Sequence, residues 1–216
     1  MIQLYHCVDA RSFRPLWALE AAGVDYELIL LPFPPRVRAK DIFKVNPLGT
    51  IPAFIDGETT MTESAAIVDY VAQKYAPGRL SVSLDEPDFG RYLNFLHFGE
   101  ATLTFPQTLI LRYARFEPAE RRQPQVADDY RAWFLARLKG LETGLEGRKW
   151  LCEERFTGAD ISVGYALLLA ESLKMGDQFP ERVSAYWDTL QSLESFQRAK
   201  AAQAKQANAA CIGPTV

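Results

Sequence analysis

The chain has 216 residues, of which 48% are hydrophobic and 24% are charged, and its formal net charge is −3. This composition is that of a globular protein with enough length for one large domain or two small ones. The slightly acidic balance argues against a nucleic-acid partner, because nucleic acids select basic surfaces.

The sequence also limits the compartment and the kind of cofactor. No apolar run approaches the roughly 18 residues of a membrane-spanning helix. The first residues, MIQLYHCVDARSF, lack the basic stretch and apolar core of a signal peptide. Cys7, Cys152 and Cys211 are odd in number and have no metal-ligand spacing. We therefore expect a cytoplasmic protein with no disulfide, no metal and no membrane partner.

The first part of the chain alternates between strand-like and helix-like segments. Residues 2–8 and 26–31 are apolar and β-prone, which predicts two strands. The unbroken apolar character of the second run is typical of a strand covered on both faces. Between them, residues 12–22 have helical spacing and end at Gly23, a favoured helix terminator. A short polar helix is expected over residues 38–45.

The most informative segment follows, with the sequence NPLGTIPAFIDGETTMTESAAIVDYV. Its Asp56-Gly57 pair between β-prone residues predicts a two-residue hairpin turn. Pro52 has no N–H group, so the backbone beside it cannot be fully paired within a sheet. The resulting order of elements predicts a thioredoxin-like βαβαββα domain with a small mixed sheet.

The last helix of this segment, predicted over residues 65–75, begins beside Glu63 and Ser64. A helix start offers unpaired N–H groups and the positive end of the helix dipole, which favour carboxylates and phosphates. With the open backbone at Pro52, it suits a small extended peptide that carries a free carboxylate. The structural alternative is that Pro52 and Gly57 only shape a hairpin and that Ser64 only caps a helix.

The remainder of the chain is predicted to be helical. We expect a thioredoxin-like domain over residues 1–77, a linker over 78–87 and an all-helical domain over 88–216. Pro106 should bend or interrupt the first long helix. Thr157 and Asp160 have the spacing of a capping box, whose role is folding. Later helices are expected over residues 127–145, 159–173, 181–193 and 196–209.

The combination NPxGxIP, then DG, then ES resembles the glutathione-binding half of the glutathione S-transferase family, and the likeness to bacterial-type cytosolic members covers nearly the whole chain. The resemblance implies a cytoplasmic homodimeric enzyme of detoxification, with glutathione as co-substrate and no metal. It implies that Pro52 is cis, that Ile51 bonds to the cysteinyl part of glutathione, and that Arg38 holds the glycyl carboxylate. The glutathione-binding residues implied are Arg38, Thr50, Ile51, Pro52, Glu63 and Ser64.

Glutathione chemistry requires a thiolate, and lowering a thiol pKa of ~8.5 by two units takes about 2.7 kcal/mol. The donors should lie where the first strand meets the first helix. Ser12, at the expected helix start, is the first choice, Tyr5 is the second, and Arg11 can supply positive charge. Each has a structural alternative, as a cap, a packed strand residue and a solvated arginine. Cys7 is expected to be a buried small hydrophobe, and only an exposed thiol would make it a redox rival.

The second substrate, a small hydrophobic electrophile, is expected between the domains, a common place for ligands. The long helix supplies Phe105, Leu109, Arg112 and Tyr113, although the last two could equally serve a dimer interface. His97 on the same helix is expected to be packed or partly exposed and not catalytic.

Two other functions remain open from the sequence. One is glutathione-dependent reduction, peroxide removal or isomerisation at the same site. The other is a binding or regulatory role without catalysis.

Overall fold

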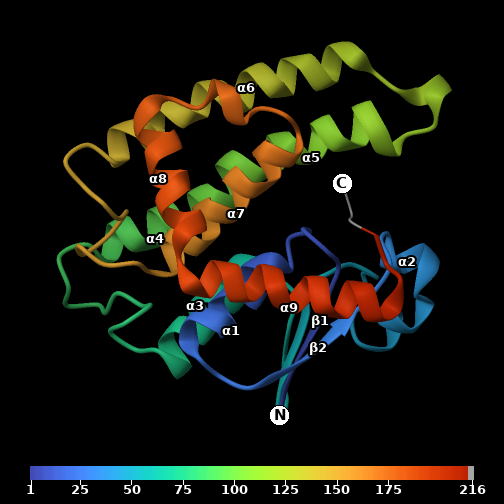
Figure 1. Ribbon diagram of the computed structural model, residues 1–216, viewed down its shortest axis with the longest axis horizontal. Helices are drawn as coiled ribbons and strands as arrows, with labels where there is room; N and C mark the ends of the chain where they lie inside the picture. The colour runs from blue at the N-terminus through green and yellow to red at the C-terminus, as the bar shows by residue number, and fades with distance from the viewer. Residues whose placement is uncertain (214–216) are drawn as a thin grey trace. The chain divides into compact units, whose positions relative to one another are not determined.

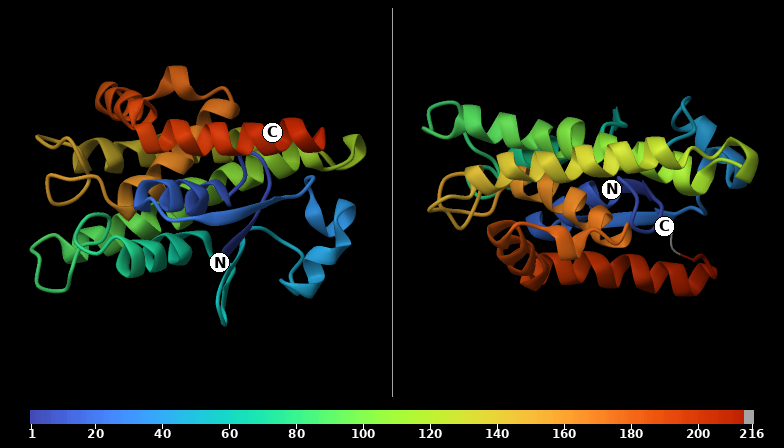
Figure 2. Two further views of the ribbon diagram at one scale, coloured as in Figure 1. Left: turned by 60° about the horizontal axis from the view of Figure 1, so that its bottom comes forward. Right: turned by 90° about the horizontal axis from the view of Figure 1, so that it is seen from above.

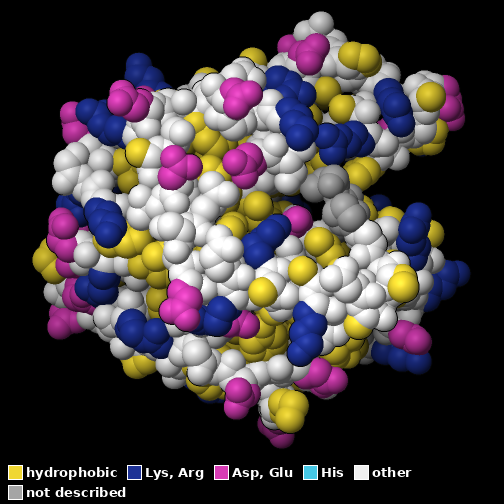
Figure 3. Space-filling model, viewed as in Figure 1, with side chains coloured by type: hydrophobic (Ala, Val, Ile, Leu, Met, Phe, Trp, Pro, Cys, Tyr) yellow, Lys and Arg dark blue, Asp and Glu magenta, His cyan; other side chains and the backbone are white. Residues whose placement is uncertain are grey.

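The computed structural model describes residues 1–213, which form two compact units (Figure 1). The first unit combines Met1–Glu86 with the chain from Leu190 onward, and the second comprises Pro87–Thr189. The last helix thus packs with the N-terminal elements, while the boundaries at residues 77 and 88 remain a prediction. No helix of the described residues is long and apolar enough to cross a membrane. Acidic and basic side chains are interspersed on the surface shown in Figure 3.

The first unit is built on a four-stranded sheet in the order β2-β1-β3-β4. β1 runs parallel to β2 and antiparallel to β3, and β3 runs antiparallel to β4. With the intervening helices, the order is βαβαββα, which confirms the predicted thioredoxin-like fold. The elements are β1 (Ile2–His6), α1 (Phe13–Ala22), β2 (Tyr26–Leu30), α2 (Pro35–Arg38), the 3-10 helix η1 (Lys40–Lys44), β3 (Ala53–Asp56), β4 (Thr59–Met61) and α3 (Ser64–Tyr75).

Two local predictions in this unit were wrong, those for the burial of β2 and for the hairpin turn. β2 lies at the edge of the sheet and is mostly half-buried, so its apolar run does not mark a strand covered on both faces. The short helix expected over residues 38–45 corresponds to η1, and the additional helix α2 begins at Pro35, because proline is well suited to a first helical turn. Asp56 pairs with Thr59, so the hairpin turn consists of Gly57 and Glu58. Gly57 has a φ of +60°, which glycine adopts without a steric penalty.

The second unit is helical, as predicted. Its core helix is α7, in which every residue from Gly158 to Ala170 is buried. Pro106 lies in the first turn of α5, and the preceding helix widens into a π-helical segment, which confirms the predicted interruption. α5 packs along α6 (Figure 2). The main elements are α4 (Phe89–His97), the π-helical η2 (Phe98–Thr104), α5 (Phe105–Leu111), the π-helical η3 (Arg112–Phe116), α6 (Pro124–Gly144), α7 (Gly158–Ser172) and α8 (Glu181–Ser192).

α7 begins at the predicted capping box. The N–H group of Thr157 donates to Oδ2 of Asp160 at 2.8 Å, and both residues are fully buried. Oδ1 of the same carboxylate accepts the N–H group of Leu151 at 3.0 Å and the hydroxyl of Tyr186 at 2.8 Å. One buried carboxylate therefore joins the start of α7 to the preceding loop and to α8.

We predict that Thr157→Ala lowers the free energy of unfolding by about 1 kcal/mol or more, because the helix loses its N-cap. Thr143→Ala is the matched control, since the hydroxyl of Thr143 is exposed and bonds back to the carbonyl of Lys139 in its own helix. Its effect should be near zero. Urea unfolding of both variants measures the difference, and equal changes would contradict the role of the cap.

Candidate functional site

The loop before β3 is held in shape by Asn46. This buried side chain donates from Nδ2 to the carbonyl oxygen of Thr50 at 2.9 Å and to its hydroxyl at 3.1 Å. Gly49 has a φ of +62°, and a Cβ atom there would lie 2.6 Å from the ring of Phe43. Only glycine therefore fits this turn, which leaves Thr50 exposed and Ile51 half-buried.

The backbone beside Pro52 lies outside the sheet. The Ile51–Pro52 peptide bond is cis, as the resemblance implies; a second cis bond, Phe33–Pro34, was not expected. The β1–β3 pairing ends at Ala53, opposite Tyr5. The peptide groups of residue 51 and its neighbour therefore face no strand partner within the sheet. Half-buried Tyr5 is paired with Ala53, the residue that follows Pro52.

The start of α3 carries a positive charge that sequence reasoning missed. Ser64 is the first residue of the helix, after the exposed Glu63. Nη1 of the fully buried Arg14 in α1 donates to Oγ of Ser64 at 3.1 Å. This guanidinium adds to the N–H groups and the dipole of the helix start, all of which favour an anion. The sequence contained one sign of this contact: Arg14 lies among the apolar residues of the predicted first helix, and arginine is rarely buried without a partner.

Ser12, the first choice for thiolate stabilisation, is fully buried at the end of the β1–α1 loop. Its Oγ lies 2.8 Å from Nδ1 of His6 and accepts the N–H group of Cys7 at 3.2 Å. Its side chain makes no capping bond to α1. Cys7 is also buried, and burial raises the pKa of its thiol to about 12. It is therefore the small buried hydrophobe that the sequence predicted.

The hydrogen bonds of His6 define its tautomer. Nε2 lies 2.9 Å from Oε1 of Gln203, and that oxygen also accepts the N–H group of Asp9 at 3.2 Å. Nε2 of Gln203 donates to Oδ1 of Asp9 at 2.7 Å, which fixes the orientation of the amide. Nε2 of His6 therefore carries a hydrogen. Burial lowers the pKa of His6 from 6.5 to about 4, so the ring is neutral at pH 7 and Nδ1 accepts the hydroxyl hydrogen of Ser12.

The other predicted site residues are more accessible. Arg11 is half-buried in the same loop, and Arg38 is exposed at the end of α2. The four residues predicted for the electrophile lie along α5 and η3 of the second unit. Phe105 is 53% exposed, and the guanidinium of Arg112 lies 5.5 Å from the ring centroid of Tyr113. Nε of Arg112 also bonds to Oε1 of Glu117 at 2.9 Å, and Leu109 is half-buried.

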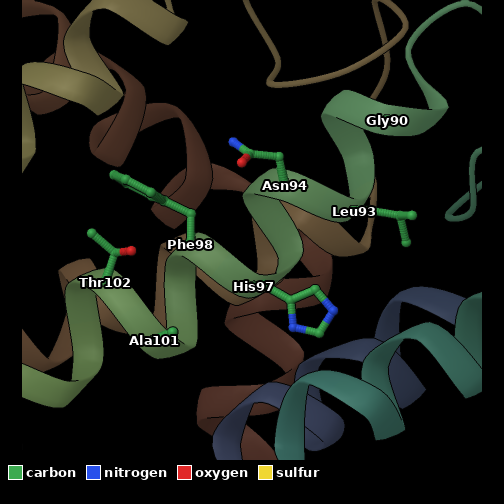
Figure 4. Close-up of a pocket in the computed structure, with 7 residues that line it drawn as sticks. All are labelled: Gly90, Leu93, Asn94, His97, Phe98, Ala101 and Thr102. Atoms are coloured by element: carbon green, nitrogen blue, oxygen red, sulfur yellow. The ribbon is translucent and has the colours of Figure 1, made fainter.

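A hollow of about 480 Å³ lies on the face of α4 and η2 and involves none of the predicted site residues. Figure 4 shows that its side chains come from successive turns of one helix, with His97 and Leu93 pointing away from Asn94 and Phe98. His97 is exposed, and no polar groups converge here as they do in a typical ligand site. Among residues 1–213, no three His, Cys, Asp or Glu side chains gather where they could hold a metal ion. The hollow is lined by Gly90, Leu93, Asn94, His97, Phe98, Ala101 and Thr102.

Comparison with known proteins finds relatives of this chain. Residues 1–73 match the family described as "Glutathione S-transferase, N-terminal domain". Glutathione S-transferase 3 of Schizosaccharomyces pombe is 37% identical over 48% of this chain and 43% of its own length. The match thus spans less than half of the yeast protein. Glutathione S-transferase GstA of Escherichia coli O157:H7 is 24% identical over 94% of this chain and 98% of its own.

Solved structures also align with this chain. The glutathione transferase URE2P8 of Phanerochaete chrysosporium, crystallised with oxidized glutathione, superposes with a TM-score of 0.83. The alignment covers 96% of each chain at 22% identity. At this identity the likeness shows the fold. The relatives and these structural neighbours are glutathione transferases.

We predict that the free energy of unfolding falls as the pH is lowered from about 6.5 toward about 4. In this window the unfolded chain binds a proton on His6 that the folded protein excludes, which costs at most about 1.4 kcal/mol per pH unit. His6→Gln removes this part of the pH dependence, whereas His97→Gln, which changes the exposed second histidine, retains it. Urea unfolding at about pH 7 and pH 5 measures both slopes, and identical slopes would contradict the buried neutral ring.

Proposed function

We propose that the chain is a glutathione S-transferase, in line with the family match over residues 1–73, and that it binds reduced glutathione in its first unit and activates the thiol for attack on an electrophile. The observation that carries this proposal is the pairing of an open backbone at Ile51 with a positively charged helix start at Ser64. An extended peptide can add to the first as a strand, while its carboxylate binds at the second.

The two ends of glutathione are assigned to different parts of this surface. The backbone of Ile51, beside cis Pro52 and Thr50, bonds to the cysteinyl part. The γ-glutamyl end binds at Glu63 and Ser64, where the buried guanidinium of Arg14 supports its carboxylate. The exposed Arg38 binds the glycyl carboxylate.

The thiolate is assigned to the β1–α1 loop. The hydroxyl hydrogen of Ser12 is already given to His6, and the side chain is fully buried, which favours a neighbouring group as the direct donor. We assign direct stabilisation to the positive charge of half-buried Arg11, with Tyr5 as the alternative. Ser12, the original first choice, then holds the loop. Lowering the thiol pKa by two units requires about 2.7 kcal/mol, within reach of one well-placed charge.

The reaction is nucleophilic substitution or addition at carbon. With an aromatic halide, the thiolate sulfur forms a bond to the ring carbon and the halide leaves with the electron pair of the broken bond. Phe105 and Leu109 provide apolar contact for a small hydrophobic electrophile, and Arg112 and Tyr113 provide polar contact. We assign the protein to the cytoplasm as a homodimer with a role in detoxification, as the family resemblance implies.

Glutathione-dependent reduction is the second candidate. A neighbour crystallised with oxidized glutathione favours it, because that ligand is the product of such a reaction. A mixed disulfide with this protein is disfavoured, since Cys7 is buried and burial raises its pKa to about 12. Reduction would therefore proceed through glutathione thiolates alone.

We predict that reduced glutathione gives saturable heat in calorimetry and that Ser64→Ala raises its Kd by about tenfold, the equivalent of one lost hydrogen bond to a charged group. Ser184→Ala, on the exposed face of α8 in the second unit, is the matched control and should leave the Kd unchanged. Absence of saturable heat with the unaltered protein would overturn the proposed function.

We predict that Arg11→Gln raises the pKa of the bound glutathione thiol by about one unit and slows conjugation of 1-chloro-2,4-dinitrobenzene about tenfold at neutral pH. Tyr5→Phe should change neither quantity. Ultraviolet absorbance of the thiolate, followed against pH, reports the pKa. Loss of activity in Tyr5→Phe with an unaffected Arg11→Gln would assign the role to the tyrosine instead.

A further inference from the structure

The last helix, α9 (Glu194–Ala210), packs on the first unit beside α1 and β2 (Figures 1 and 2). Its contact with α1 is aromatic. The ring of Phe196 lies 5.5 Å from that of Phe13 and 5.0 Å from that of Trp17, both edge to face. Nε1 of Trp17 donates to Oγ of Ser195 at 3.1 Å. The first turn of α9 is therefore fixed on α1.

The buried face of α9 continues from this aromatic contact to a polar residue. Phe196, Ala199 and Gln203 are its buried residues, and their spacing places them on one face of the helix. Gln203 is 2% exposed. A polar side chain at such a position must find partners, because an unpaired buried amide is costly.

The described partners of Gln203 are His6, the last residue of β1, and Asp9 in the β1–α1 loop. Its Oε1 accepts from Nε2 of His6 and from the N–H group of Asp9, and its Nε2 donates to Oδ1 of Asp9. Nζ of Lys200, one turn earlier on α9, lies 2.7 Å from the same carboxylate oxygen. Nδ1 of His6 in turn accepts the hydroxyl hydrogen of Ser12 at the far end of the loop. Two neighbouring side chains of α9 thus engage the beginning, the middle and, through His6, the end of the loop.

The loop needs such support. Asp9 has a φ of +53°, in the left-handed region that aspartate adopts more readily than most residues with a Cβ atom, but still at an energetic cost. Its N–H group and its carboxylate both bond to Gln203, and the N–H group of Ala10 donates to the carbonyl oxygen of Cys7 at 3.1 Å. The conformation of Asp9 is therefore held from α9 as well as by a turn within the loop.

We propose that Gln203 and Lys200 are positioning residues for the thiolate: they act through Asp9 and His6 to hold the β1–α1 loop, and with it Arg11, in the conformation that stabilises the glutathione sulfur. This inference rests on the proposed function, because it assigns the loop its chemical role. Neither side chain needs to touch glutathione for this effect.

Gln203→Ala, compared with Gln206→Ala on the exposed face of the same helix, tests the proposal. We expect Gln203→Ala to raise the pKa of the bound thiol by about one unit and to lower kcat about tenfold near neutral pH, with the Kd for glutathione within about threefold. A purely structural residue would alter the melting temperature and leave the pH profile unchanged. Gln206→Ala should change none of these quantities.

A second readout does not depend on glutathione. In a Cys211→Ser background, which removes the exposed thiol, buried Cys7 reports opening of the loop and buried Cys152 reports unfolding of the second unit. Gln203→Ala should speed modification of Cys7 by a thiol reagent about tenfold, because the population of molecules with an open β1–α1 loop should rise about tenfold. Cys152 should remain protected. Mass spectrometry of the modified peptides distinguishes the two cysteines.

The outcomes separate the inference from the proposed function. Unchanged Cys7 reactivity and an unchanged thiol pKa in Gln203→Ala would overturn the inference while conjugation by the unaltered protein stands. Absence of glutathione binding by the unaltered protein would overturn both. If Gln203→Ala exposes Cys152 as well, the variant is unfolded. The test is then the thiol pKa of Lys200→Met, compared with that of Lys205→Met, which changes an exposed lysine of the same helix. Lys200→Met should shift the thiol pKa in the same direction by a smaller amount, and no shift would overturn the inference.

Discussion

A buried neutral imidazole requires one hydrogen-bond acceptor and one donor at fixed positions, and His6 has both. Oε1 of Gln203 accepts at Nε2, and the hydroxyl of Ser12 donates at Nδ1. Because each partner is itself buried, none can turn to water without leaving a polar group unpaired. The conformation of the β1–α1 loop depends on this arrangement. This arrangement also determines what Ser12 can do, because its hydroxyl has one hydrogen and donates it to His6.

The opposite side of the candidate site depends on charge. The start of α3 has the positive end of the helix dipole, and Arg14 brings a full positive charge to Ser64 from α1. Near it, the chain turns at Gly49 and passes through cis Pro52 before β3 begins, so that backbone groups remain unpaired in the sheet. A ligand that matches this surface is extended, forms backbone hydrogen bonds and carries a carboxylate. The tripeptide glutathione has all three properties.

The parts of the fold and of the site that depend on near neighbours in sequence could be predicted. The βαβαββα order, the capping box at Thr157 and the start of α3 follow from turn residues, caps and periodicity within a few positions. The hairpin register was wrong by one residue because Asp56 joined the strand pairing and left the turn to Gly57 and Glu58. Contacts between distant residues could not be predicted in this way. His6 and Gln203 are 197 positions apart, and Arg14 and Ser64 are 50 apart. The contact of His6 with Gln203 leaves Nδ1 of His6 as the acceptor for Ser12, so local sequence suggested a helix cap where the structure has a donor to His6.

The packing of α9 on the first unit has a consequence for how such a protein is made and recombined. Residues 1–86 leave the ribosome before the second unit exists, yet the helix that supports their first loop is synthesised only after that unit is complete. Until α9 is synthesised, Phe13, Trp17 and His6 therefore lack the side chains of α9 that cover them in the folded protein. For the same reason, exchanging only the N-terminal part between related proteins separates the β1–α1 loop from the side chains of α9 that bond to it. A crossover that preserves this chemistry has to carry two pieces of gene, one from each side of the helical insert.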